Sequence, residues 1–213
     1  KINMKKKLNP KRALTRNIAA MLQLASVSDI MEGIDWYERA ARLARRLSGS
    51  YGCSFVQAVG VISALSPRNK WPRNCRDAES VIKAWSLGEE VLEVTCCTFG
   101  YNKQKAKRIL EEGAAREDII AILNGPKTVA FARSIFGEQS AVCVDGHAFA
   151  VWIGERVPLD QTPKIDSGGL YRRIAQDYCT VAKRSKSISG HQLTAAQVQA
   201  VTWVCYRRLM GIK

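Results

Sequence analysis

Apolar residues recur along this chain with the spacing of one face of an α-helix. Ile18, Met21, Leu22 and Ala25 occupy positions i, i+3, i+4 and i+7, which a helix brings to one side. The alternation that marks a half-buried strand is not sustained in the sequence. The helical spacing predicts further helices over residues 30–47, 55–65, 75–85, 102–112, 117–123, 126–136, 145–153, 170–183 and 195–209. We therefore expect an all-α fold.

Residues that begin or end helices divide this pattern. Ser54 and Asp145 each precede an apolar stretch, where a side-chain oxygen can accept a hydrogen bond from a free backbone N–H. Pro126 suits a first helical turn. The glycines and serine at 49–52 predict a break, and residues 185–190 predict a loop.

The charge of the chain narrows its partners. The 213 residues contain 33 lysines and arginines against 19 acidic residues, which gives a net charge of +14. Such a balance indicates a polyanionic partner, first nucleic acid and second a membrane surface. No apolar run reaches the ~18 residues of a membrane span. We therefore expect a nucleic acid as the partner, with a merely solvated basic surface as the alternative, and we expect neither membrane insertion nor an obligate protein partner.

The cysteines and histidines bear on compartment and cofactors. The seven cysteines are odd in number and mostly lie in apolar runs, and there are two histidines. This usage is typical of reduced, buried thiols in a cytoplasmic protein. No C-x-x-C pair occurs, so we expect neither a metal site nor any other cofactor.

One amine and one carboxylate are the candidate catalytic pair. Lys127 follows Gly125 and Pro126 at an expected helix start, and Asp145 follows the apolar segment 141–144. An amine beside a carboxylate is suited to nucleophilic catalysis. Taken alone, Lys127 also fits an exposed lysine of a first turn, and Asp145 also fits a helix N-cap.

Several segments together resemble the helix-hairpin-helix DNA glycosylase superfamily of the endonuclease III type. In that family a hairpin of the form L-P-G-x-G-x-K-T-A precedes an apolar helix, and V-D-T-H follows. Residues 123–129 and 144–147 correspond to these two motifs and are separated as in the family. Residues 99–106 resemble the family segment I-G-x-x-x-x-K-A, and residues 54–64 resemble its first barrel helix. The resemblance covers roughly residues 51–156.

The resemblance implies a two-lobed, helix-hairpin-helix DNA glycosylase-like fold with a cleft between the lobes. Residues 51–138 would form a barrel-like lobe, and residues 1–50 with 139–213 the other. Lys127 would attack the sugar carbon that bears the base, and Asp145 would accept a proton or stabilise positive charge on the sugar. The protein would then be a DNA glycosylase, with abasic-site lyase activity as a further step. It would act in the cytoplasm, at the nucleoid, or in the host cytoplasm if a phage encodes it.

The remaining candidate residues would contact DNA or the flipped base. Trp71 is expected either to stack on a displaced base or to pack under its loop, and Lys103 and Lys105 to contact phosphate or to lie on a solvated face. The full set of expected contacts is Arg68, Lys70, Arg73, Asn102, Lys103, Lys105, Gly125 and Thr128 for DNA, and His147, Leu65, Asn69 and Trp71 for the pocket.

The sequence also departs from the family pattern. The hairpin is two residues shorter, Leu65 stands where the family has glutamine, Gly146 replaces threonine, and the four-cysteine iron–sulfur loop is absent. Two other functions therefore stay open. One is a phage-type enzyme of DNA base hypermodification on the same fold, and the other is a non-catalytic DNA-binding module.

Overall fold

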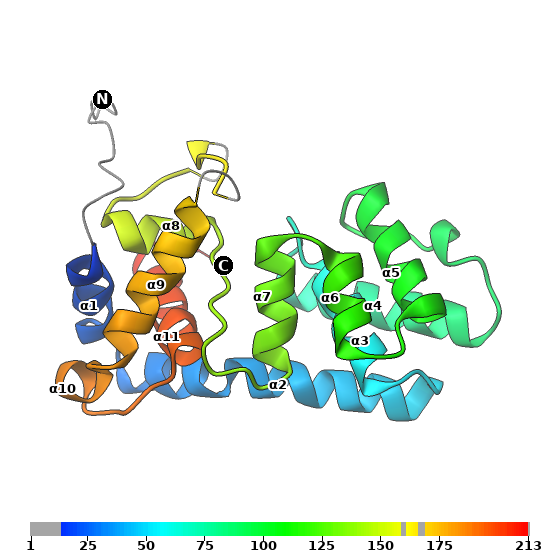
Figure 1. Ribbon diagram of the computed structural model, residues 1–213, viewed down its shortest axis with the longest axis horizontal. Coiled ribbons are helices and arrows are strands. Elements are labelled where there is room, and N and C mark those ends of the chain that lie inside the picture. Colours follow the sequence, from blue (N-terminus) through cyan, green and yellow to red (C-terminus); the bar gives the residue numbers. More distant parts are fainter. Residues whose placement is uncertain (1–13, 159–160, 166–168, 213) are drawn as a thin grey trace. The chain divides into compact units, whose positions relative to one another are not determined.

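The chain folds into helices joined by loops in the computed structural model, which describes residues 14–158, 161–165 and 169–212 (Figure 1). No strand occurs among these residues, so the expected all-α class is confirmed. Internal contacts divide the chain into two compact units. Unit 1 comprises residues 1–33 and 144–213, and unit 2 comprises residues 34–143.

Unit 2 is organised around a buried helix, α3 (Phe55–Leu65). Ser54 and Gln57 form a capping box at its start, which satisfies two backbone groups reciprocally. The helix is apolar on every side and contacts the neighbouring helices of the unit, as expected of a central helix. A Cβ at Gly60 would come within 2.9 Å of Ile109 and Ile119, so glycine permits this close packing. The helix α3 contacts α4 (Trp71–Ser86), α5 (Gly100–Glu112), α6 (Arg116–Leu123) and α7 (Pro126–Ile135). The unit also contains η1 (Val91–Glu93), which contacts α4 and α5, and the later part of α2 (Val27–Tyr51).

Unit 1 is organised around the C-terminal helix, α11 (Ala195–Leu209), which contacts α1, α8 and α9. Thr194 and Gln197 form the capping box at its start. A Cβ at Gly33 would lie 2.5 Å from the backbone of Val201. Gly33 therefore lets the first turns of α2 approach α11 backbone to backbone. The other helices of this unit are α1 (Thr15–Gln23), α8 (Gly146–Ile153), α9 (Leu170–Ala182) and α10 (Ser185–Ser189).

Two helix boundaries and one predicted loop differ most from the prediction. The helix α2 continues through the expected break and ends at Tyr51, and α4 begins at Trp71, inside the expected loop. Residues 185–189 form the short helix α10, where a loop was predicted. The compact units divide the chain at residues 33/34, inside α2, and at 143/144. The lobes 51–138 and 1–50 with 139–213 stay a prediction.

The structure also bears on the membrane and on cysteine pairing. Within the described part of the chain, none of the helices has both the length and the apolar character needed to cross a bilayer. All seven cysteines are free thiols.

Candidate functional site

The candidate nucleophile Lys127 lies in the first turn of α7, just after a two-residue turn that follows α6. Asn124 ends α6 in the left-handed conformation with φ 42°, and Gly125 is extended and precedes α7. No side chain caps α7, and Pro126 has no N–H to offer. In the described residues the backbone N–H groups of Lys127 and Thr128 have no acceptor. The start of α7 thus presents two free donors beside a half-buried lysine side chain.

Thr128 and Lys105 both bind backbone carbonyls of this hairpin. The Thr128 hydroxyl donates to the carbonyl of Gly125 at 3.1 Å. The Lys105 ammonium donates to the carbonyl of Leu123, at the negative end of the α6 dipole. Burial lowers the pKa of Lys105. Lys105 is therefore a C-terminal cap of α6. Its contact with a DNA phosphate stays a prediction, because this bond uses one of the three N–H donors of the ammonium.

The candidate carboxylate Asp145 is the N-cap of α8 in unit 1. Its Oδ1 accepts the N–H of Ala148 at 2.8 Å, and its Oδ2 accepts the indole N–H of Trp203 at 2.9 Å. The side chain is half-buried. Each carboxylate oxygen therefore has one fixed donor, which orients the group while part of it stays open to solvent.

Aromatic and basic groups surround this carboxylate. His147 lies with its ring centroid 6.3 Å from that of Trp203 and 5.7 Å from that of Tyr206. The Arg207 guanidinium lies 4.4 Å above the centre of the Trp203 ring. Burial raises the pKa of Tyr206, and the charge of Arg156 opposes that rise. Trp203 is itself half-buried and binds the candidate carboxylate.

The loop between α3 and α4 is fastened to the buried carboxylate of Asp77. Oδ2 of Asp77 accepts the side-chain amide of Asn69 at 2.9 Å and the N–H of Cys97 at 2.8 Å. Its Oδ1 accepts Nε of Arg73 at 2.6 Å. Burial alone would raise the pKa of Asp77, but the hydrogen bonds from Arg73, Cys97 and Asn69 outweigh it and hold the pKa below its usual value.

Of the residues of this loop that were expected to contact DNA, some are exposed and others bind Asp77. Arg68 and Lys70 are exposed, and in unit 2 no carboxylate forms an ion pair with either. Arg73 forms an ion pair with Asp77, and the side-chain amide of Asn69 also donates to the carbonyl of Leu65 at 3.2 Å. Asn69 and Arg73 therefore shape the loop.

Three further expected contacts point inward. Leu65 is fully buried, because it ends the central helix facing the core, and it does not reach the surface as a wedge would. Asn102 is buried and donates to the Thr98 hydroxyl at 2.9 Å. The Lys103 ammonium donates to the carbonyls of Leu92 and Val94. The expected contact with DNA is corrected for the buried Leu65 and Asn102, whereas for the half-buried Lys103 it stays a prediction.

Trp71 packs inside unit 2. Its ring centroid lies 5.8 Å from that of Trp36 and 6.4 Å from that of Phe131, edge-on to the latter. Of the two expectations for Trp71, the structure places it in the packed arrangement.

Two aromatic residues of the same region were not among the expected contacts. Phe99 and Tyr101 lie at the start of α5 with 42% and 56% of their surface exposed. Their ring centroids are 5.5 Å apart and their planes differ by 9°. The Arg68 guanidinium lies 5.3 Å from the centre of the Phe99 ring. The sequence signal was the pair of aromatic residues flanking Gly100, but its exposure could not be read from the sequence.

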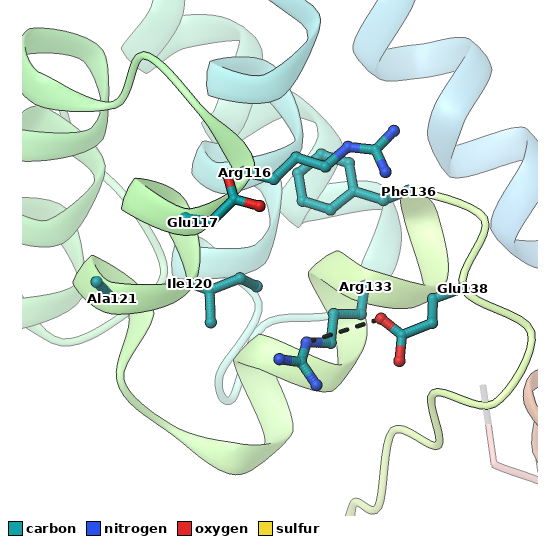
Figure 2. A pocket seen from close by; sticks show the side chains of 7 residues that line it. All are labelled: Arg116, Glu117, Ile120, Ala121, Arg133, Phe136 and Glu138. Atoms are coloured by element: carbon teal, nitrogen blue, oxygen red, sulfur yellow. Dashed lines mark ion pairs between the residues drawn. The ribbon is translucent and has the colours of Figure 1, made fainter.

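An open pocket of about 430 Å³ lies elsewhere on unit 2 (Figure 2). Arg116 lies 4.8 Å over the ring of Phe136, and Arg133 pairs with Glu138 at 3.8 Å. Two arginines thus face two glutamates, which balances the local charge. None of the residues expected from the sequence lines this pocket, whose walls are Arg116, Glu117, Ile120, Ala121, Arg133, Phe136 and Glu138.

In the parts of the chain that the structure describes, no group of three histidine, cysteine or acidic side chains is arranged to hold a metal ion.

No curated protein and no solved structure matches the chain. A protein-family model matches residues 1–209. Because that match covers nearly the whole chain, the protein belongs to the family of unknown function DUF7178.

Proposed function

We propose that this protein is a DNA glycosylase with abasic-site lyase activity, in which Lys127 is the nucleophile and Asp145 its carboxylate partner. The proposal includes the two-lobed helix-hairpin-helix architecture and the cleft that the resemblance implies. DNA as the partner is supported by the net charge of +14.

The observation that carries the proposal is the open start of α7. The N–H groups of Lys127 and Thr128 lack acceptors in the described residues, and no side chain caps the helix. Free N–H groups at the positive end of a helix dipole bind phosphate. A phosphate bound there would bring the adjoining sugar to the Lys127 amine, which stands on the same turn.

The segment that leads to Asp145 is attached to this turn. The Cys143 thiol donates to the backbone carbonyl of Lys127, with sulfur and oxygen 3.7 Å apart. Asp145 follows Cys143 by two residues, and two residues of extended chain span about 7 Å. The length of the chain therefore allows both functional groups to serve one sugar.

The chemistry would proceed in two stages. The Lys127 nitrogen would form a bond to the sugar carbon as the bond from that carbon to the base breaks, and the base would leave with the electron pair and take up a proton. The nitrogen, now bound to this carbon, would give a proton to Asp145, and the bond from the carbon to the ring oxygen would break as the carbon–nitrogen double bond of the Schiff base forms, with the ring oxygen taking up a proton. Loss of a proton from the neighbouring carbon would then expel the 3′ phosphate by β-elimination. The target base would have to be flipped out of the stack first.

Borohydride trapping tests this mechanism directly. Wild-type protein is incubated with duplex DNA that carries one abasic site, and borohydride reduces any Schiff base to a stable amine. We expect a covalent protein–DNA adduct for wild type and none for Lys127→Ala.

Two variants serve as controls for this experiment. Lys127→Arg keeps the positive charge but offers no reactive amine, so it should bind DNA and form no adduct. Lys83→Ala removes an exposed lysine from the last turn of α4 and should form the adduct normally. An adduct that persists in Lys127→Ala, or wild-type protein that binds the DNA without forming an adduct, would contradict the lyase mechanism. In the second case, nucleoside mass analysis distinguishes base modification from binding alone.

A further inference from the structure

We propose that Phe99, Tyr101 and Arg68 form a stacking surface for the unpaired bases of single-stranded DNA. This surface lies wholly within unit 2 and does not involve Lys127. The choice of DNA over RNA rests on the proposed function, whereas the stacking itself does not.

The exposure of the two rings is not explained by the fold. Phe99 occupies the N-cap position of α5 and makes no capping hydrogen bond, although this position favours serine, threonine, asparagine or aspartate. With 42% of its surface exposed, it also contributes little to the core. Tyr101, which is 56% exposed, covers one face of Phe99. The parts of the two nearly parallel rings that remain exposed offer a π-surface on which a nucleobase can stack.

The surface is held by hydrogen bonds of the loops beneath it. The Thr98 hydroxyl donates to the carbonyl of Pro67 at 3.3 Å, and the N–H of Cys97 donates to buried Asp77. Arg68 adopts the left-handed backbone conformation with φ 56°, which is uncommon outside glycine. That conformation accompanies the approach of its guanidinium to the Phe99 ring. The loops that precede the rings and carry the arginine are therefore fixed by hydrogen bonds within unit 2.

The positive charge of this surface favours a polyanionic ligand. Arg68 and Lys70 are exposed and lack a carboxylate partner within unit 2. Aromatic faces beside unpaired cations are the combination with which proteins bind single strands, because every base has a π-face and every nucleotide has a phosphate. In a duplex the bases are already stacked on one another, so the aromatic pair should favour the single strand.

Fluorescence anisotropy with a labelled oligothymidine strand tests the proposal. Phe99→Ala and Tyr101→Ala should each weaken binding about tenfold, since stacking on one aromatic residue is worth roughly that factor. Their affinity for a duplex should change much less. Arg68→Ala should instead reduce the slope of log affinity against log salt by about 0.7, the value for one lost phosphate contact on a single strand.

Matched variants separate stacking from loss of apolar surface or of folding. Phe99→Leu keeps an apolar side chain without a π-face and should bind as weakly as Phe99→Ala, whereas Tyr101→Phe should bind as wild type does. Leu87→Ala removes another exposed apolar side chain of unit 2, which is 61% exposed, and should have no effect. Circular dichroism confirms that each variant is folded.

The outcomes distinguish this proposal from the proposed function. Unchanged single-strand affinity in both alanine variants, or an equal loss for single strand and duplex, overturns the stacking surface. Tighter binding of an RNA strand of matching sequence overturns the choice of DNA. If wild type forms no borohydride adduct but its single-strand affinity depends on both rings, the enzyme mechanism fails and the stacking surface stands.

Discussion

Two aspartates of unit 1 are held by the same kinds of donor, an indole N–H and a backbone N–H, yet they differ in burial. Asp177 accepts the indole N–H of Trp152 at 2.8 Å and the N–H of Leu14 at 3.0 Å. Asp177 is 4% exposed and Trp152 is 1% exposed. This carboxylate therefore ties the residue before α1 to α8 and α9 and is closed to any ligand.

Asp145 has the corresponding donors in Trp203 and Ala148, but both Asp145 and Trp203 are only half-buried. Arg207 lies over the indole ring. The same two kinds of donor thus bind one aspartate in the core, where Arg173 also lies 3.9 Å from Oδ1 of Asp177, and one aspartate that stays partly exposed. A fixed orientation alone does not identify a functional carboxylate. A candidate carboxylate needs access to solvent as well, and of these two residues only Asp145 has both.

The largest effect is expected from removal of the buried carboxylate. Asp177→Ala should lower the free energy of unfolding by about 3 kcal/mol, because two donors inside the protein lose their acceptor at roughly 1–3 kcal/mol each. Urea denaturation followed by tryptophan fluorescence measures this loss. Asp177→Asn retains an acceptor oxygen and should lose less. A loss under about 1 kcal/mol in Asp177→Ala would show that these bonds do not stabilise unit 1 as its burial implies.

A smaller effect on stability is expected at the exposed carboxylate. Asp145→Ala should cost about 1 kcal/mol, the usual value for a lost N-cap, because the Trp203 N–H can then reach water. Asp145→Asn should cost less, since asparagine caps a helix about as well as aspartate. Urea denaturation of both variants gives these values.

Activity separates the two roles of Asp145. Under the proposed function, Asp145→Asn should excise base poorly although its stability is nearly that of wild type. Base release from a damaged or modified duplex, measured beside the unfolding free energy, checks this. Full activity in Asp145→Asn would reduce the residue to a helix cap and remove the reason to distinguish it from Asp177.

The sequence predicted those features that depend on a few neighbouring residues. The bounds of α3 and α11 were confirmed, and so was Asp145 as the N-cap of α8, because capping needs only a side chain and an N–H a few residues away. The predicted end of α2 at Leu47 was wrong. The glycine penalty of about 1 kcal/mol is opposed there by contacts with α4, where Arg46 and Tyr51 both bind Glu79.

The features that the sequence did not reveal depend on residues far apart in the chain. The indole of Trp203 binds Asp145, which lies 58 residues earlier in the sequence. No local sequence pattern predicts such a bond. Lys105 resembles a phosphate-binding lysine in its motif, yet its ammonium binds the end of α6. The short helix α10 has weak helix-forming residues, and the buried hydroxyl of Ser185 accepts the N–H of Leu193 at 2.8 Å. Tertiary contacts outweigh propensity in such segments.

A third carboxylate of unit 1 sharpens the comparison, because its main partner is a cation instead of an indole. Asp29 is 2% exposed and accepts Nη2 of Arg208 at 2.7 Å and the N–H of Ser26 at 2.8 Å. Burial would raise the pKa of Asp29, but the hydrogen bonds from Arg208 and Ser26 outweigh it and hold the pKa below its usual value.

A lowered pKa in the folded state makes this carboxylate a source of acid sensitivity. Its contribution to stability is complete above the pKa of the unfolded state, near 4, and is lost as the pH falls through the lower pKa of the folded state. The unfolding free energy should therefore fall less between pH 7 and pH 3 in Asp29→Asn than in wild type. We expect this difference to be smaller than the losses of unfolding free energy in Asp177→Ala and Asp145→Ala. Urea denaturation at both pH values measures the difference. Equal falls in the two proteins would mean that Arg208 stabilises the protonated carboxyl of Asp29 as strongly as the ionised one. The pair would then stabilise the fold by its hydrogen-bond geometry and not by its charge.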